Sequence, residues 1–217
     1  MNSASGSEAA RPRGAGRATG SPDRPVTPLK VVVAGAFGVG KTTFVGSASD
    51  ITPLRTEEVM TAPSEGIDDL SALPQKRTTT VAMDFGRLDL TDDLVIYLFG
   101  TPGQYRFWFM WDQLVRGAVG VVVLVDTRRL IDSFPVLDYF DRTGLPVVVG
   151  INGFDGEYPY TEDEVREALA LDPARPIVTC DARERTSATQ TLATLVEHAL
   201  AARDAGARRT PHPEGAR

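Results

Sequence analysis

A glycine-rich loop between an apolar run and a helix-forming stretch is the feature that most constrains the fold of this chain. Residues 29–34 are apolar apart from Lys30, residues 35–42 follow the pattern Gly-x4-Gly-Lys-Thr, and residues 41–49 fit a helix. Such an apolar run is typical of a strand that is covered on both faces of a parallel sheet. Glycines allow the backbone to turn sharply from that strand into a helix. The unit therefore predicts an α/β domain organised around residues 35–42.

The rest of the chain alternates strands and helices in the same way. Apolar and β-branched runs predict five further strands, at residues 81–90, 94–99, 119–125, 147–151 and 177–180. Longer stretches predict four further helices, at residues 104–116, 131–142, 161–171 and 187–204. This alternation indicates a doubly wound, mostly parallel six-stranded sheet with helices on both faces. The stretch 50–76 has no strong period, and we interpret it as an insertion with room for a short strand around residues 55–61.

Composition sets the domain boundaries and excludes several classes of protein. Residues 1–28 and 205–217 are poor in large apolar side chains, so we expect disordered tails around one domain at residues 29–204. The net charge of −6 does not favour nucleic acid as a partner. The single cysteine, Cys180, suits a reducing compartment, and the apolar runs are too short to span a bilayer. We therefore expect a cytoplasmic protein.

Residues 35–42 have the chemistry of a phosphate-binding loop. Backbone N–H groups of a glycine-rich turn converge on phosphate oxygens, and the start of the following helix adds the positive end of its dipole. Lys41 would reach the β- and γ-phosphates of a nucleotide, and the Thr42 hydroxyl would be a ligand of Mg²⁺. The residues predicted to bind the nucleotide here are Gly35, Phe37, Gly38, Val39, Gly40, Lys41, Thr42 and Thr43. An ordinary glycine turn with a chance lysine is the alternative, and the flanking strand and helix argue against it.

Four further segments, in this order after the phosphate loop, resemble motifs of the Ras-like small GTPases. Residues 80–85 are similar to the switch I segment, and residues 100–104 are similar to the start of switch II. Residues 152–155 resemble the guanine-recognition motif, and residues 180–183 resemble the last loop that contacts the base. The resemblance covers residues 29–204 and implies a P-loop NTPase fold. It looks closest to the bacterial GTP-binding proteins of actinobacterial conservon operons, which are related to the gliding-motility GTPases.

The two switch segments imply the residues of hydrolysis. On the match to switch I, Thr80 would complete the coordination of Mg²⁺ and sense the γ-phosphate. Gly103 would give its N–H to the γ-phosphate, and Gln104 would orient the attacking water. One position departs from the family pattern, because the aspartate that supports Mg²⁺ there is Gly100 here. For residues 78–80 the alternative is three β-branched residues that simply begin a strand.

The base-recognition segments imply guanine as the base. An aspartate carboxylate accepts hydrogen bonds from N1 and N2 of guanine, which adenine does not offer, and this role falls to Asp155. Asn152 begins the motif, but its usual lysine is Gly153, so that a packing surface for the base and ribose is lost. Ala182 would donate its N–H to O6 of guanine, and Arg183 stands where lysine does. GTP is therefore favoured over ATP.

An arginine near the switch segments is a candidate for neutralising charge in the transition state. Arg77 lies three residues before Thr80, the offset at which heterotrimeric G-protein α subunits place such an arginine. Arg106, just past Gln104, is a second candidate. The alternative for Arg77 is a solvated residue beside Lys76, at the end of the insertion.

An aromatic run follows switch II and suggests a partner surface. Residues 107–111 are Phe-Trp-Phe-Met-Trp, which would cover every side of a helix. They are either buried beneath the insertion or partly exposed for a partner that reads the nucleotide state. The conservon resemblance implies a Roadblock/LC7-type protein and a membrane sensor-kinase-like protein as partners. These would hold the chain peripherally at the inner face of the membrane.

Together these features predict a GTP-binding and GTP-hydrolysing molecular switch with Mg²⁺ as cofactor, slow without a partner. Two alternatives stay open. Gly100 and Gly153 favour a nucleotide-binding module with little or no hydrolysis, but Gln104 argues against it. Asp155 disfavours a P-loop ATPase.

Overall fold

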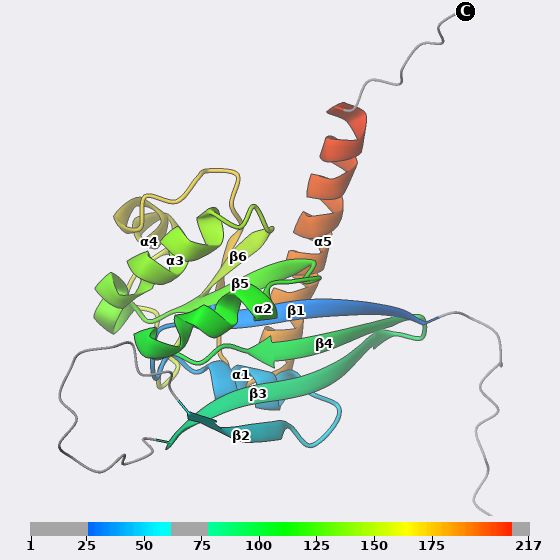
Figure 1. Ribbon diagram of the computed structural model, residues 1–217. Coiled ribbons are helices and arrows are strands. Elements are labelled where there is room, and N and C mark those ends of the chain that lie inside the picture. Colours follow the sequence, from blue (N-terminus) through cyan, green and yellow to red (C-terminus); the bar gives the residue numbers. More distant parts are fainter. Residues whose placement is uncertain (1–25, 62–77, 210–217) are drawn as a thin grey trace, which may run out of the picture.

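One twisted sheet forms the body of the protein in a computed structural model, which describes residues 26–61 and 78–209 (Figure 1). The order of strands in the sheet is β2-β3-β4-β1-β5-β6-β7. Their bounds are β1 Thr27–Gly35, β2 Leu54–Thr61, β3 Thr78–Thr91, β4 Leu94–Gly100, β5 Gly120–Val125, β6 Val147–Asn152 and β7 Ile177–Cys180. β3 is antiparallel to both β2 and β4, and the other neighbouring strands are parallel. The predicted α/β fold with a mostly parallel sheet is confirmed, and part of the insertion adds β2 to the six predicted strands.

The helices follow the predicted order, and three of them differ from their predicted form or bounds. Their bounds are α1 Lys41–Ala48, η1 Tyr105–Met110, α2 Trp111–Leu114, η2 Thr127–Ser133, α3 Phe134–Asp141, α4 Glu162–Ala168 and α5 Arg185–Arg209, where η marks a 3-10 helix. The predicted helix 104–116 is a 3-10 helix followed by a single α-helical turn. The predicted helix 131–142 begins as η2, and α3 starts where Pro135 stands in the first turn, because proline lacks the N–H that a helix interior needs. α5 continues to residue 209, beyond the predicted domain end at 204.

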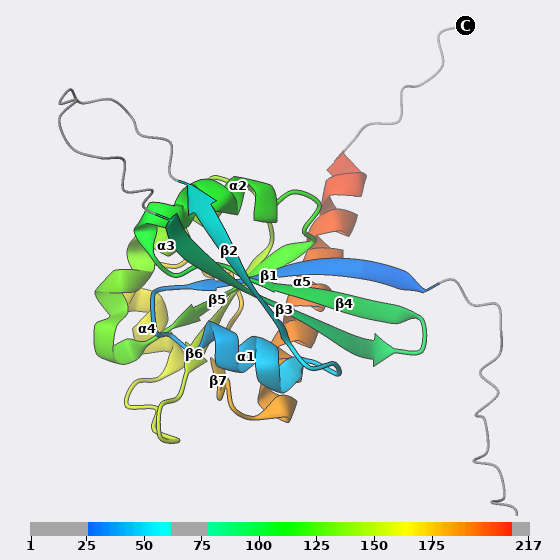
Figure 2. The same cartoon turned by 60° about the horizontal axis from the view of Figure 1, so that its bottom comes forward.

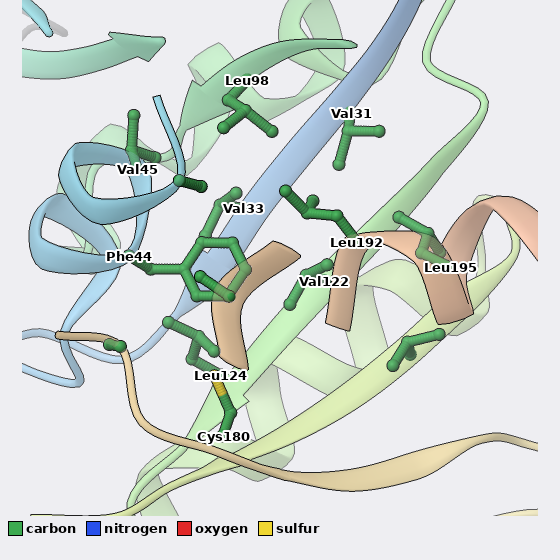
Figure 3. Packing of buried hydrophobic residues seen from close by; sticks show 14 of the residues in the cluster. Val31, Val33, Phe44, Val45, Leu98, Val122, Leu124, Cys180, Leu192 and Leu195 are labelled. Carbon is green, nitrogen blue, oxygen red and sulfur yellow. The ribbon is translucent and has the colours of Figure 1, made fainter. Parts of the chain in front are cut away.

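Helices lie on both faces of the sheet (Figure 2). An apolar core lies between the sheet and each layer of helices. α1 and α5 cover one face, where Phe44 and Leu192 pack against Val33 and Leu124 of the central strands (Figure 3). α2, α3 and α4 cover the other face. β1, β5 and β6 are therefore enclosed on both sides, as their unbroken apolar runs require. This arrangement puts the carboxyl ends of the parallel strands and the start of α1 at the same edge of the sheet.

The aromatic run at residues 107–111 packs mainly against α3. The ring of Trp111 is fully buried, stacks on Trp108 with centroids 4.6 Å apart, and stacks on Phe140 at 5.4 Å. Its Nε1 donates to the Pro102 carbonyl at 3.3 Å, which ties η1 and α2 to the end of β4. Phe109 is 57% exposed. Trp111 is therefore part of the core, Trp108 is partly buried against it, and Phe109 is the member that faces solvent.

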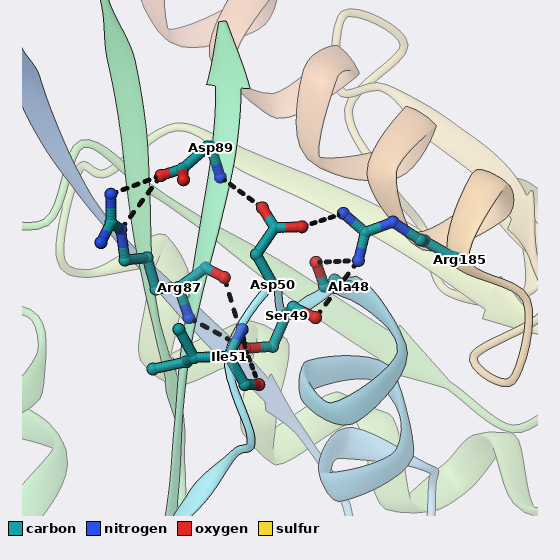
Figure 4. A network of polar contacts seen from close by, with 7 residues as sticks. All are labelled: Ala48, Ser49, Asp50, Ile51, Arg87, Asp89 and Arg185. Carbon is teal, nitrogen blue, oxygen red and sulfur yellow. Dashed lines mark hydrogen bonds and ion pairs between the residues drawn. The ribbon is translucent and has the colours of Figure 1, made fainter. Parts of the chain in front are cut away.

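A polar network fixes the C-terminal end of α1 to β3 and α5 (Figure 4). Arg185, at the start of α5, donates to the carbonyls of Ala48 and Ser49 at 3.3 and 3.2 Å and forms an ion pair with Asp50. Asp50 also accepts from the backbone N–H of Asp89 at 2.7 Å. The last carbonyls of a helix have no partners within it, so these bonds satisfy groups that water would otherwise solvate. The network thereby holds α1, and the loop that precedes it, against the sheet.

We predict that Asp50→Asn lowers the free energy of unfolding by about 1 kcal/mol at pH 7, because a charged acceptor of two hydrogen bonds is lost at a partly exposed position. The N–H of Asp89 and then Arg185 hold the pKa of Asp50 below its usual range. The stability that the carboxylate contributes is therefore complete at neutral pH and is lost as the pH falls through the lowered pKa. Urea unfolding at pH 7 and in acid measures both effects.

The matched control is Asp138→Asn, at an exposed position of α3. A difference between Asp50→Asn and the wild type that stayed constant from pH 7 into the acid range would contradict the assigned charge effect.

Candidate phosphate-binding site

The loop between β1 and α1 has a backbone that only glycine accommodates at two positions. Gly35 and Gly40 have positive φ angles of 145° and 105°. A Cβ on Gly35 would lie 2.6 Å from the Leu124 carbonyl oxygen, and one on Gly40 would lie 2.6 Å from Nδ2 of Asn152. α1 begins directly after the loop without a side-chain cap. The first N–H groups of a helix have no partner within it, so this end of α1 suits an anion.

Lys41 fills the inside of the loop. Its side chain is 8% exposed, and Nζ donates to the carbonyls of Gly35 and Ala36 at 2.9 and 2.7 Å. Burial lowers the pKa of Lys41 to about 8, and the charge of Asp84 opposes this shift. A buried ammonium group whose other near partners are neutral carbonyls favours an added negative charge beside it.

A cavity of about 380 Å³ opens beside Lys41 and is lined by three segments that are separate in the sequence. Its lining consists of Phe37, Gly38, Gly40, Lys41, Thr42, Thr43, Asp84, Thr101, Pro102, Gly103, Gln104 and Phe107. The predicted switch II residues Gly103 and Gln104 thus stand at the phosphate loop. Gly103 approaches closely, since a Cβ there would lie 2.7 Å from Nζ of Lys41 and 2.9 Å from Cα of Phe37.

Asp84 supplies a carboxylate beside Gly100, the position at which the aspartate of the family pattern is missing. The register of the β3–β4 pair sets Asp84 directly opposite Gly100. A Cβ added to Gly100 would lie 3.1 Å from Cβ and 3.3 Å from Oδ2 of Asp84. The hydroxyl of Thr42 donates to Oδ2 of Asp84 at 2.6 Å. The carboxylate therefore reaches Thr42 from the neighbouring strand.

Asp84 lies inside the predicted switch I segment, where no role is predicted for it from the sequence. The hairpin of residues 81–99 was the available signal, because antiparallel pairing sets residues near 84 against residues near 100. Thr101 was missed as well. Its Oγ1 is buried at the cavity wall and has no hydrogen-bond partner within the described part of the chain.

Asn152 joins the phosphate loop to the two loops predicted to recognise the base. It is 6% exposed, its Nδ2 donates to the Val39 carbonyl, and its Oδ1 accepts from the N–H of Ala182, both at 2.9 Å. We predicted that the Ala182 N–H donates to the base, but in this structure it is engaged by Asn152. Arg183 is likewise paired with Asp181 at 2.9 Å.

Asp155 is exposed in the loop after β6, close enough to Arg128 and Arg183 to affect the pKa of both. Its carboxylate is thus available at the surface beside the loop that follows β7.

The structure does not bring Thr80 to Thr42. In β3 it pairs with Val59 of β2, four residues before Asp84. Strands rise about 3.3 Å per residue, so Thr80 and Asp84 are about 13 Å apart along β3. A role for Thr80 at the metal requires this end of β3 to leave its pairing with β2. Arg77 lies outside the described residues, and so does the side chain of Arg106.

The α/β fold of this chain is similar to that of solved G domains. The cytosolic domain of the T. maritima FeoB iron transporter in a GDP form superposes with a TM-score of 0.58 at 19% identity, over 81% of this chain and 64% of that domain. The FeoB G domain from Methanococcus jannaschii gives 0.53 at 13% identity, over 81% of this chain and 99% of the other. These similarities establish the fold.

Sequence comparison places the chain in a family. Residues 33–202 match the family described as conserved hypothetical ATP binding protein, and the chain belongs to that family. An uncharacterized protein of Methanocaldococcus jannaschii is 30% identical over 129 residues, which cover 58% of this chain and 71% of the relative. Among the described residues, no helix has the length and apolar character needed to cross a membrane.

We predict that Asn152→Ala destabilises the protein by about 1–3 kcal/mol, because it leaves the buried Val39 carbonyl and Ala182 N–H without partners. Asn152→Asp is the informative companion. It keeps an acceptor for the Ala182 N–H but sets a carboxylate oxygen against the Val39 carbonyl, so it should be no more stable than the alanine variant. Urea unfolding of the three proteins measures this, and an Asn152→Ala protein as stable as the wild type would exclude the bridging role.

Proposed function

We propose that this protein is a GTP-binding molecular switch that hydrolyses GTP slowly without a partner. The observation that carries the proposal is the single cavity in which Lys41 and Thr42 meet Asp84 of β3 and Gly103 and Gln104 after β4. On the Ras-like match, these residues belong to the phosphate loop and to the two segments that respond to a γ-phosphate in switch proteins.

The phosphates would lie along the loop against the start of α1. The Lys41 ammonium would exchange its two carbonyl acceptors for phosphate oxygens, and the free N–H groups at the start of α1 would bind the β-phosphate. The N–H of Gly103, already close to Lys41, would bind a γ-phosphate. Loss of the γ-phosphate would release Gly103 and the segment after it.

The donor groups at Thr42 fit a Mg²⁺ ion. A hydroxyl and a carboxylate, 2.6 Å apart, supply oxygen atoms of the kind that Mg²⁺ prefers, and Mg²⁺ commonly takes few protein ligands beside phosphates and waters. The buried Thr101 hydroxyl would find a partner in one of those waters. Bound Mg²⁺ would neutralise charge on the β- and γ-phosphates. Thr42 and Asp84 would hold it, with Thr80 joining only if the start of β3 rearranges.

Gln104 would orient the water that attacks the γ-phosphate. It is exposed at the cavity rim, directly before η1, and the Trp111 ring that follows η1 donates to the Pro102 carbonyl beside it. Movement of residues 103–110 with nucleotide state would also move the exposed ring of Phe109. We propose this ring as the part of switch II that a partner reads. The partner types implied by the conservon resemblance, a Roadblock/LC7-type protein and a membrane sensor-kinase-like protein, belong to the same proposal.

Asp155 favours guanine over adenine as the base of the bound nucleotide. Its exposed carboxylate follows Asn152, and guanine offers it two donors where adenine offers none. The description of the family as ATP binding points to the other base, while the FeoB comparison is with a cytosolic domain in a GDP form.

Competition decides between the two bases. In the experiment, labelled GTP is bound to the purified full chain, and unlabelled GTP, GDP or ATP is added as competitor, with and without Mg²⁺. We expect GTP and GDP to compete at least 100-fold better than ATP, because a rejected base leaves the Asp155 carboxylate without its donors. Equal competition by ATP would make the protein an ATP-binding member of its family. Tight GTP binding without phosphate release over hours would make it a binding module.

We further predict that Asp84→Asn reduces the gain in GTP affinity on adding Mg²⁺ by about 10- to 100-fold, while the affinity in EDTA stays close to that of the wild type. The reason is that the carboxylate holds the metal and not the phosphates. Asp92→Asn, in the exposed β3–β4 turn, is the control. An unchanged Mg²⁺ effect in Asp84→Asn would remove Asp84 from the site.

A further inference from the structure

A tight hairpin follows β6 and folds the chain back onto the start of the base-recognition segment. Phe154 pairs with Glu157, whose N–H donates to the Phe154 carbonyl at 3.0 Å. The two residues between them, Asp155 and Gly156, have φ angles of 58° and 79°. Positive φ at both central positions is the signature of a two-residue turn that Asp-Gly favours.

The hairpin lays the ring of Tyr158 over Gly153. A Cβ on Gly153 would lie 2.4 Å from Cζ and 2.6 Å from Oη of Tyr158, and atoms cannot approach that closely. Glycine at position 153 is therefore explained by close packing. The tyrosine ring fills the space into which a side chain at 153, such as the lysine usual in this motif, would extend.

Tyr158 also faces the loop after β7. Burial and the charge of Asp181 raise the pKa of the Tyr158 hydroxyl, while Arg183 opposes the shift. Tyr158 therefore lies near Asp181 and Arg183 of the loop after β7, while its ring packs on Gly153 of the loop after β6. It remains 39% exposed, so part of it is open to a ligand.

We propose that Tyr158 binds the nucleobase and ribose of the bound nucleotide in place of the absent lysine stem. The proposal rests on the proposed function, since it concerns the base end of the same site. A flat aromatic ring is a suitable surface for a purine, because base–aromatic stacking is favourable for any base. Tyr158 then supplies binding strength, and Asp155 in the turn beside it supplies the choice of base.

The test separates contacts to the base from contacts to the phosphates. Affinities for GDP and for inorganic triphosphate are measured on the full chain by calorimetry. In Tyr158→Ala the affinity for GDP should fall about 10- to 100-fold, the range of stacking losses, while the affinity for triphosphate stays within about twofold. Tyr158→Phe should keep the wild-type affinity for GDP, and Tyr160→Ala, an exposed tyrosine of the same loop, is the matched control.

An exchange of the two residues tests whether they fill one space. Gly153→Lys alone should weaken GDP binding, because the lysine stem collides with the ring. The double variant Gly153→Lys with Tyr158→Ala should bind GDP at least fivefold more tightly than Tyr158→Ala. Tyr158→Leu, which keeps apolar bulk at this position, replaces the alanine variant if the latter does not fold, and it too should lose affinity for GDP but not for triphosphate.

Three results would overturn the proposal. Tyr158→Ala and Tyr158→Leu binding GDP like the wild type would show that the ring does not touch the base. A double variant no better than Tyr158→Ala would show that the ring and a lysine do not share one space. A wild-type protein that binds triphosphate but not GDP would remove the nucleotide site itself, and the proposed function with it.

Discussion

The side-chain amide of Asn152 is the interaction on which the arrangement of the site depends. One group at the end of β6 accepts from the loop after β7 and donates to the loop after β1, at 2.9 Å in both cases. Three loops that are distant in the sequence are thereby fixed relative to one another at the carboxyl edge of a parallel sheet. This is the edge at which open α/β sheets bind their ligands. The glycine at position 40 is dictated by the same contact, because a Cβ there would collide with the amide.

The second constraint is the pairing of β3 with β4. It sets Asp84 opposite Gly100 and allows a carboxylate from β3 to meet Thr42, where the Ras-like pattern draws its carboxylate from the neighbouring strand. Gly100 is then a condition for this arrangement, since any side chain there would crowd Asp84. Gly153 is constrained in the same way in the proposed base-binding loop, because the ring of Tyr158 fills the space that a side chain at 153 would need. The two departures from the Ras-like pattern are both positions at which a neighbouring side chain fills the space.

The parts of the protein that could be predicted from the sequence are those encoded locally. The loop of residues 35–42, the strand–helix alternation and the position of Gln104 follow from spacing and periodicity within short stretches. The position of Asp84 follows only approximately from the hairpin, because it depends on the pairing of two strands and a bulge between Asp89 and Thr91 shifts their register. The partner of the Ala182 N–H was missed because it comes from a side chain thirty residues away.

The most direct test of this account moves the carboxylate from one strand to the other. Asp84→Gly should lose most of its Mg²⁺-dependent GTP hydrolysis, and the double variant Asp84→Gly with Gly100→Asp should recover a large part of it, since removal of the Asp84 side chain makes room at position 100. Single-turnover hydrolysis at saturating GTP measures both. A wild-type hydrolysis rate in Asp84→Gly, or a double variant that hydrolyses GTP no faster than Asp84→Gly, would contradict the assignment of Asp84 as the carboxylate that holds Mg²⁺.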